Sequence, residues 1–243
     1  MLQVKNHPQT FAHHTTHLSC KFSLLVWNIH KENQTKAFTE MLQRLTQTYK
    51  SDLLLFQEVK YPKNTPFSLQ EYSFALAGNM ETKQNIFGVL TAAKSAFSEI
   101  TPALSSKKEL GFISHKSFLL SKHNIANKKE LTILNLHAIN FVTTKSFAHE
   151  LHAIKEKLLK LEGPLIVAGD FNTWSKKRQK LLEDFQKELG LKKLQIDDER
   201  HVKQIMWQTI DHIYYKDLKP LQALAIDTKN ISDHNPIYAE FVL

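Results

Sequence analysis

The chain has 243 residues, of which 42% are hydrophobic and 23% charged, a balance that supports one large globular domain and argues against wholesale disorder. Its single cysteine excludes an intramolecular disulfide, no Cys or His spacing resembles a zinc site, and no apolar run reaches the length of a membrane span. Lys and Arg number 32 against 24 Asp and Glu, and the net charge of +8 favours a polyanionic partner such as nucleic acid or an anionic membrane surface.

Residues 1–20 are polar and rich in histidine, without the periodicity of a helix or a strand. A flexible N-terminal arm is therefore expected over 1–20, followed by one domain over 21–243. The arm has no signal-peptide pattern, so a cytoplasmic location is predicted, with export by another route left open. The chain is expected to be a monomer, and its sequence implies no protein partner.

Apolar runs bounded by polar residues predict strands, and apolar residues three or four positions apart predict helices. The first half is expected to contain a strand over 22–28, a helix from Phe38 to Tyr49, and strands over 52–59, 72–77, 86–92 and 117–125. The second half is expected to contain a strand over 130–138 that pairs with 117–125, a helix from Phe147 to Leu161, a strand over 165–168, a helix from Leu181 to Leu189, and strands over 210–215 and 237–243. Several strands follow one another directly, which predicts an α+β sandwich of two packed, mostly antiparallel sheets flanked by helices.

Polar groups lie at the ends of five of these strands. They are Asn28, Gln57-Glu58, Gly169-Asp170-Phe171-Asn172, Asp211-His212 and Ser232-Asp233-His234-Asn235-Pro236. Each is weak evidence alone, because a Glu after a strand is usually a solvated loop residue and Gly, Asp and Asn are common in turns. A strand end is a rigid platform, however, so five such groups together indicate a polar site.

In this order, and over nearly the whole chain, the five groups resemble the endonuclease/exonuclease/phosphatase superfamily. The segments LLVWNIHKE, LNLHAINF, AGDFNTWSKKR and SDHNP extend the resemblance to a bacterial YafD-like branch over residues 22–243. The resemblance implies a DNase I-like four-layer fold. It also implies a hydrolase that cleaves phosphate esters with Mg²⁺ or Mn²⁺ as cofactor.

The expected metal ligands are oxygen groups, because Mg²⁺ prefers near-octahedral oxygen ligation that includes one or two carboxylates. Glu58 is the main candidate. The resemblance implies an amide oxygen from Asn28 beside it, and Asp233 is a further candidate ligand. Exonuclease III-like members carry an Asp where this sequence has His30, which weakens both a second metal carboxylate and an abasic-site activity.

His234 is the candidate general acid or base, because the ordinary pKa of histidine lies near neutrality. The resemblance implies Asp211 as the carboxylate that orients it. Asp170 and Asn172 stand two residues apart and are expected to face the same cleft, with Asn172 donating to transition-state oxygens. Whether Asp170 or His234 is the base is left open. His137 matches a position that contacts the phosphate in the superfamily.

The resemblance also implies a phosphate contact from Asn140, and further contacts are expected from the segment that follows Asn172. Lys176, Lys177 and Arg178 lie in the first turn of a predicted helix, where cations oppose the helix dipole, so bound substrate phosphates are expected to compensate. Trp174 is a candidate stacking surface for bases. The alternative is a solvated basic turn with Trp174 in the core.

The favoured function is hydrolysis of DNA or RNA, because of the basic charge. A phospholipid or inositol-phosphate phosphoesterase is an alternative, and it would need a basic headgroup pocket or an apolar insertion loop, of which none is evident. A non-catalytic binding module on the same fold is a further alternative, but the catalytic candidates are all present. The enzyme reading requires Glu58, Asp170, Asp211 and His234 to converge on one pocket.

Overall fold

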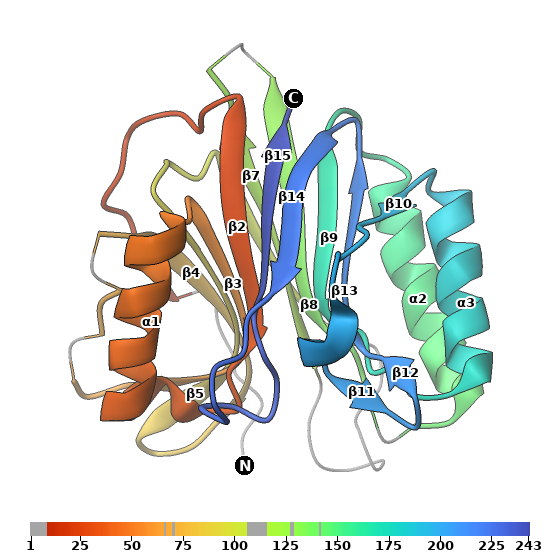
Figure 1. The fold of residues 1–243 in the computed structure, drawn as a ribbon, viewed down its shortest axis with the longest axis horizontal. Coiled ribbons are helices and arrows are strands. Elements are labelled where there is room, and N and C mark those ends of the chain that lie inside the picture. Colours follow the sequence, from red (N-terminus) through yellow and green to blue (C-terminus); the bar gives the residue numbers. More distant parts are fainter. Residues whose placement is uncertain (1–8, 66, 70, 106–115, 127–128, 141) are drawn as a thin grey trace.

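Two β-sheets pack face to face, and helices cover their outer faces, which gives four layers (Figure 1). The computed structural model describes residues 9–65, 67–69, 71–105, 116–126, 129–140 and 142–243. This arrangement confirms the predicted α+β sandwich. None of the described helices is both long enough and apolar enough to cross a membrane.

The first sheet has the strand order β1-β4-β5-β3-β2-β15-β14. Its strands are β1 (Gln9–Phe11), β2 (Lys21–Asn28), β3 (Leu53–Pro62), β4 (Ser73–Glu81), β5 (Asn85–Ala93), β14 (Lys219–Ala225) and β15 (Ile237–Val242). Only β2 and β3 are parallel, and helix α1 (Lys36–Tyr49) connects them. Thr35 caps α1 by accepting a hydrogen bond from Phe38 N, and the helix buries its predicted apolar face against this sheet.

The second sheet has the order β10-β13-β9-β8-β7-β6. Its strands are β6 (Glu99–Leu104), β7 (Ser117–Asn124), β8 (Glu130–His137), β9 (Leu165–Asp170), β10 (Lys192–Lys193) and β13 (Asp211–Lys216). Only β8 and β9 are parallel, and α2 (Thr144–Leu158) connects them. The predicted antiparallel pairing of β7 with β8 is confirmed. Helix α3 (Lys176–Glu188) follows β9, and a separate hairpin of β11 (Gln204–Ile205) and β12 (Gln208–Thr209) precedes β13.

Several strands were not predicted, because their residues lack a buried apolar pattern. Strand β6 lies at an edge, is largely exposed and contains Pro102. Strand β14 forms an edge of the other sheet, and Ala223 is its one buried residue. The short strands β1, β10, β11 and β12 have too few residues to show any periodicity.

Part of the segment expected as a flexible arm contacts the domain. Strand β1 pairs with β4, and Leu18 is buried and donates its backbone N–H to Asn124 O. The backbone N–H groups of His13 and His14 both donate to Ser73 Oγ. Residues 9–20 therefore lie against the sheets, whereas residues 1–8 lie outside the described residues.

The core between the sheets follows the two-residue period of the strands. Leu24 and Val26 of β2 face inward with Ile166 and Ala168 of β9, while the intervening residues, such as Leu25, face the outer helices. The same period places Asn28, His137, Asp170 and Asp211 on the inner faces, in line with buried apolar residues of their own strands. Polar side chains thus gather at one end of the space between the sheets.

Strand register aligns these polar residues. In the second sheet His137 is paired with Asp170, and Asp170 with Asp211, so the three form a row across β8, β9 and β13. In the first sheet Asn28 is paired with Gln57. Glu58 would face outward by the two-residue period, but a register shift between Phe56 and Val59 and a positive φ of 56° at Glu58 interrupt it. The bulge thereby brings the Glu58 carboxylate to the same edge as the row.

Arg178 holds the loop after β8 against the loop after β9. Its buried guanidinium donates to the carbonyls of Ile139, Asn140, Asn172 and Val142, and it packs over the rings of Phe147 and Trp174. These hydrogen bonds hold the two loops together and occupy the donors of the guanidinium. The structure therefore corrects the expected contact of Arg178 with substrate phosphates.

Replacing Arg178 with Met should lower the free energy of unfolding by about 3 kcal/mol or more, because several buried carbonyls lose their donor. Urea denaturation followed by circular dichroism measures this change. Lys177→Met is the matched control, since Lys177 is the exposed neighbour on the same helix and its loss should cost less than about 0.5 kcal/mol. Equal stability of the two variants would contradict the clamp.

Candidate active site

A histidine and a carboxylate form the centre of the site. His234 Nδ1 lies 2.7 Å from Asp211 Oδ2, and both side chains are buried. Burial opposes protonation of the imidazole, but the charges of Asp211 and Asp170 outweigh it and raise the pKa of His234 to about 9. Asp211 therefore fixes the orientation of the ring and favours its protonated form.

The last residues of β2 hold the loop that carries His234 in place. Ser232 Oγ donates to Asn28 O at 2.7 Å and accepts from His234 N at 3.2 Å. Trp27 Nε1 donates to His234 O at 2.8 Å. Neither Ser232 nor Trp27 was a predicted site residue, although both lie in the segments that carried the resemblance. These bonds fix the position of the imidazole in relation to the end of β2.

Asp170 is the most buried carboxylate of the site and lies between the two sheets. Its Oδ2 is 3.9 Å from His234 Nε2 and accepts from Asn28 Nδ2 at 3.1 Å, while Oδ1 accepts from Asn172 N at 2.9 Å. Burial and the neighbouring charge of Asp211 raise the pKa of Asp170 to about 7, against the opposing effect of these partners. Asp170 can therefore exchange a proton near neutral pH.

Asn172 is positioned by its backbone. It has a positive φ of 50°, which Asn tolerates better than most residues, and its Nδ2 donates to Ala138 O at 2.9 Å. Gly169, the residue directly before Asp170, has a φ of 137°, and a Cβ there would lie 2.0 Å from Leu136 O. Only glycine fits this contact between β8 and β9, which keeps Asp170 and His137 in the same row.

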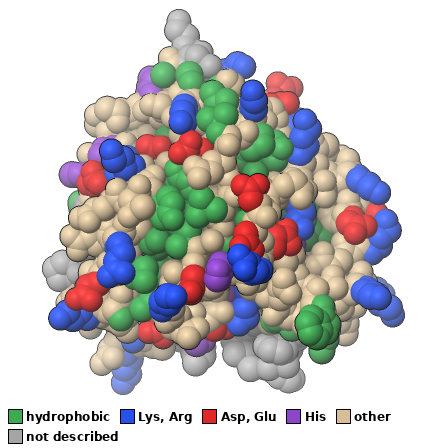
Figure 2. All heavy atoms as spheres, viewed as in Figure 1, with side chains coloured by type: hydrophobic (Ala, Val, Ile, Leu, Met, Phe, Trp, Pro, Cys, Tyr) green, Lys and Arg blue, Asp and Glu red, His purple; other side chains and the backbone are tan. Residues whose placement is uncertain are grey.

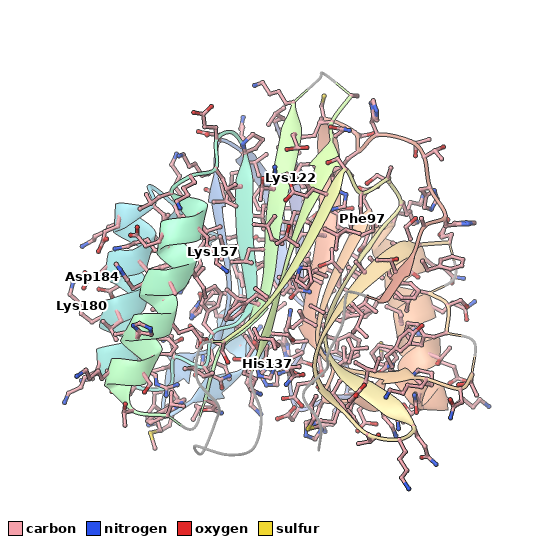
Figure 3. All side chains as sticks on the ribbon, turned by 180° about the vertical axis from the view of Figure 1, so that it is seen from behind. Phe97, Lys122, His137, Lys157, Lys180 and Asp184 are labelled. Carbon is pink, nitrogen blue, oxygen red and sulfur yellow. The ribbon has the colours of Figure 1, made fainter. Side chains whose placement is uncertain are left out.

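His137 lies between two carboxylates, Asp170 at the end of β9 and Glu58 at the bulge within β3. Figure 3 shows it at the end of its strand, at the edge of the sheets where the site lies. Its Nε2 is 3.6 Å from Asp170 Oδ2 and 3.8 Å from Glu58 Oε1. Burial and the nearby Lys116 ammonium, whose Nζ is 3.1 Å from Nε2, hold the pKa of His137 well below its usual range. The ring is therefore neutral at physiological pH.

Two lysines that the sequence analysis did not select contribute positive charge here. Lys31 Nζ contacts Glu58 Oε2 at 2.7 Å, and Lys116 lies beside His137. Burial of Glu58 opposes its ionisation, but His137, Lys31 and Lys116 outweigh this and lower its pKa to about 2. No strand-end motif marks these lysines, because they reach the site from the loop after β2 and from the residue before β7.

The donor set fits a hard divalent cation. Glu58 is ionised and about one fifth exposed, so a cation can reach its oxygens, and Asn28 offers an amide oxygen that now accepts from His30 N. Asp170, Asp211 and His234 also place ligand atoms within 4.8 Å of one another. Within this trio, the His234–Asp211 hydrogen bond already uses one nitrogen and one carboxylate oxygen.

Asp233 does not join these ligands. Its side chain is about half exposed and accepts from Lys203 Nζ at 3.2 Å. His234 is buried, whereas its neighbour Asp233 is exposed. Asp233 is thus paired with Lys203 in this structure, and its role as a metal ligand stays a prediction. His30, at the position where exonuclease III-like members carry an Asp, is exposed.

The other predicted substrate contacts lie at the rim. Trp174 is half-buried, its Nε1 donates to Asn140 Oδ1 at 2.9 Å, and one face of its ring is occupied by Arg178. Lys176 and Lys177 are exposed in the first turn of α3, which Ser175 caps by accepting from Arg178 N. Arg178 thus covers one face of the half-buried Trp174 ring, and the two lysines are accessible to an anion.

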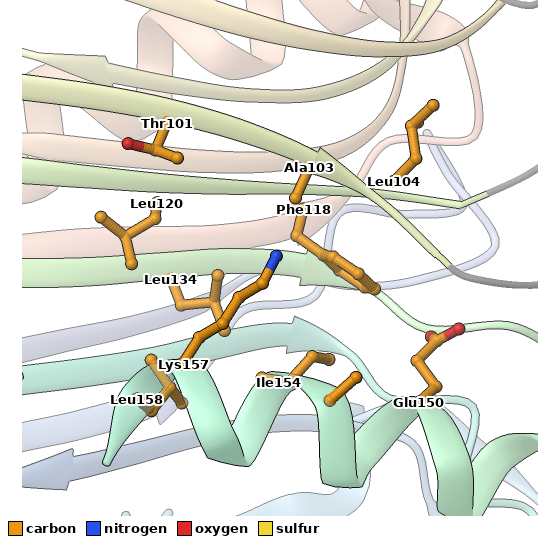
Figure 4. A pocket seen from close by; sticks show the side chains of 11 residues that line it. Thr101, Ala103, Leu104, Phe118, Leu120, Leu134, Glu150, Ile154, Lys157 and Leu158 are labelled. Carbon is orange, nitrogen blue, oxygen red and sulfur yellow. The ribbon is translucent and has the colours of Figure 1, made fainter. Parts of the chain in front are cut away.

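Two hollows differ in chemistry and position. One of about 470 Å³ adjoins His234 and is lined by Arg200, His201, Lys203, Asp233 and Asn235, together with Val202 and Gln204. The other, of about 210 Å³, lies between α2 and strands β6 to β8 and is lined mainly by apolar side chains such as Phe118 and Ile154 (Figure 4). The polar hollow is lined by Asp233 and Asn235, the residues on either side of His234 in the chain.

Comparison with known proteins identifies the family and the fold. The model of the Endonuclease/Exonuclease/phosphatase family matches residues 25–234. A UPF0294 protein of Erwinia tasmaniensis is 31% identical over 224 residues, which cover 91% of this chain and 81% of that protein. Two solved structures have similar folds. An endonuclease/exonuclease/phosphatase family protein from Leptotrichia buccalis aligns with a TM-score of 0.68 and 18% identity, which covers 91% of this chain and 100% of that one. D. rerio TDP2 complexed with a single-strand DNA product aligns with a TM-score of 0.69 and 15% identity, which covers 92% of this chain and 99% of that one. The chain therefore belongs to the endonuclease/exonuclease/phosphatase family of phosphoesterases, within its bacterial YafD-like branch.

Proposed function

We propose that this protein is a Mg²⁺- or Mn²⁺-dependent phosphodiesterase that hydrolyses nucleic acid. The observation that carries the proposal is the convergence of Glu58, Asp170, Asp211 and His234 at one edge of the two sheets, with His137 between the carboxylates. These groups come from four strands and a loop of both sheets. A purely structural role does not require such a concentration of buried ionisable groups.

Glu58 and Asn28 would hold the cation, which when bound neutralises charge on the phosphate and polarises it toward attack. Asp170 is suited to accept a proton from the attacking water, because its pKa of about 7 lets it act as a base near neutral pH. His234, with a pKa of about 9, is protonated under the same conditions and is suited to donate to a phosphate oxygen or to the leaving group. This assigns the base to Asp170, which the sequence left open.

His137 and Asn172 would position the phosphate. The neutral imidazole of His137 can donate one hydrogen bond without adding a charge that competes with the cation, and Asn172 lies beside Asp170. The ammonium of Lys116 next to His137 adds positive charge to the side of the site where the phosphate oxygens would lie. The non-reacting oxygens of the phosphate would thus receive hydrogen bonds or positive charge from His137, Asn172 and Lys116.

Nucleic acid is the favoured substrate for three reasons. The net charge is +8, the exposed Lys176 and Lys177 lie at the rim beside Asn172, and the similarly folded D. rerio TDP2 was solved with a single-strand DNA product. The hollow beside His234 is polar, as a ribose-phosphate chain requires. A phospholipid or inositol phosphate is the alternative substrate class, and a panel of substrates separates the two.

Asp211→Asn should lower kcat about 100-fold or more on a single-stranded oligonucleotide, because the amide cannot hold His234 in its protonated form. The activity of the wild type should require Mg²⁺ or Mn²⁺ and stop with EDTA.

The pH dependence should also change. Activity that depends on protonated His234 falls as pH rises through about 9, so any residual activity of the Asp211→Asn variant should decline at lower pH than that of the wild type. Initial rates across a pH series measure both effects.

Asp184→Asn is the matched control, because it makes the same chemical change on an exposed turn of α3, where Asp184 pairs with Lys180 (Figure 3). Its kcat should equal that of the wild type. The panel contains plasmid, single-stranded DNA, RNA, sphingomyelin and phosphoinositides. Cleavage of lipid alone would reject nucleic acid as substrate, and EDTA-resistant cleavage would reject the metal.

Lys31→Met should tighten Mg²⁺ binding about threefold to tenfold, because the cation no longer competes with an ammonium for the Glu58 carboxylate. Isothermal titration of Mg²⁺ measures this without any turnover. Lys36→Met removes an exposed lysine that pairs with Glu40 on α1 and should leave the affinity unchanged. Weaker Mg²⁺ binding by Lys31→Met would mean that Lys31 supports the metal site instead of competing with it.

A further inference from the structure

The β11–β12 hairpin presents two large apolar side chains to solvent. Met206 and Trp207 form its two-residue turn, and their side chains are 70% and 92% exposed. Hydrophobic side chains protrude at the place of this hairpin in Figure 2. Both residues have a positive φ, 51° and 65°, a conformation that such tight turns usually assign to Asn or Gly. A strained turn that exposes Met and Trp favours neither stability nor solubility, which suggests a binding role.

The base of the hairpin is attached to the active site. Thr173 Oγ1 and Gln179 Nε2 both donate to Thr209 O, at 3.3 and 2.9 Å. Ile210 N donates to Lys203 O across the base of the hairpin, and Phe171 N donates to Ile210 O. The hairpin is thus bonded to the loop that carries Asn172 and to the first turns of α3. Its tip therefore has a fixed direction in relation to the catalytic groups.

The tip lies within reach of a bound substrate chain. Trp207 precedes Asp211 by four residues, which in extended geometry spans about 13 Å at about 3.3 Å per residue. That distance corresponds to at most about four stacked nucleotides of one strand. The hollow of about 470 Å³ is lined by Lys203 and Gln204 at the start of the hairpin and by Asp233 and Asn235, which flank His234 in the chain. A substrate chain bound in this hollow would lie beside the hairpin.

The surroundings of Trp207 identify the class of ligand. The hollow is lined by charged and amide side chains, so it suits a charged, hydrated backbone and does not suit an acyl chain. Lys176 and Lys177 are exposed on the first turn of α3, where Gln179 bonds the hairpin. An exposed indole beside a polar hollow and exposed cations is a combination that binds single strands, through stacking of bases and attraction of phosphates.

We propose that Trp207, supported by Met206, is a stacking platform for an unpaired base of a single-stranded nucleic acid held in the active site. This inference rests on the proposed function and narrows it to substrates whose bases near the cleaved phosphate are unpaired. Paired bases inside a duplex have no free face for the indole. The protein therefore prefers single strands or frayed ends over intact duplex.

The test is binding of a fluorescently labelled single-stranded oligonucleotide and of its duplex, by anisotropy, in the Asp211→Asn background so that cleavage does not interfere. Trp207→Ala should weaken single-strand binding about tenfold or more, whereas Trp207→Phe, which keeps an aromatic face, should remain within about threefold. Duplex binding should change less than about twofold in either variant. Quenching of tryptophan fluorescence by the unlabelled single strand should also disappear in Trp207→Phe.

Leu221→Ala is the matched control, because it removes an exposed apolar side chain on the edge strand β14 and should leave binding unchanged. Circular dichroism verifies that the Trp207 variants are folded. Equal single-strand affinity of the wild type and Trp207→Ala, while the wild type still cleaves nucleic acid, would overturn the stacking site and leave the proposed function intact. Failure of the wild type to bind or cleave any nucleic acid would overturn both. Trp207-dependent binding to vesicles of anionic phospholipid without oligonucleotide binding would assign the hairpin to a membrane surface and reject our proposal.

Discussion

The active site depends on one constraint of strand register, which aligns His137, Asp170 and Asp211 across three neighbouring strands. Because side chains alternate between the two faces of a sheet, all three point into the space between the sheets, where low solvent exposure strengthens their mutual charges. A shift of one residue in β9 would turn Asp170 toward α2 and α3 and separate it from His234. Gly169 protects this register, since β8 approaches too closely for any side chain there.

The two sheets contribute in different ways. The second sheet supplies the row of His137, Asp170 and Asp211, whereas the first supplies Asn28 and, through the bulge in β3, Glu58. Bonds across the interface hold the halves together: Asn28 Nδ2 donates to Asp170, and Gln57 Nε2 donates to Asn135 Oδ1 at 2.7 Å deeper in the core. Each sheet also has one parallel pair joined by a helix, so the carboxyl ends of both pairs meet at the same edge (Figure 1). Chemistry concentrates where these ends converge.

Charge balance explains why such a buried site is tolerated. Three carboxylates in close proximity would raise one another's pKa, and Asp170 does show this effect. Protonated His234 offsets Asp170 and Asp211, while Lys31 and Lys116 offset Glu58. The two lysines therefore stabilise the negative charge of the Glu58 carboxylate. Arg178 and the β11–β12 hairpin then fix the rim, the first by bonding the loop carbonyls and the second by its attachment to Thr173 and Gln179.

The sequence by itself determined the sandwich, the long central strands, the three helices and the strand-end groups Asn28, Glu58, Asp170, Asp211 and His234, because buried strands and amphipathic helices have strong periodicities and the motifs lie where those periodicities end. Only the tertiary structure decided which neighbouring residues face the site. In the structure Asp233 is exposed and His234 is buried, and the Arg178 guanidinium bonds loop carbonyls. Lys31 and Lys116 contact the site residues, and the Met206–Trp207 turn is exposed. Their positions depend on loop geometry and on contacts between distant segments, which no local pattern records. The edge strands β6 and β14 escaped prediction for a related reason, since pairing with a neighbour holds them in place without a buried apolar face.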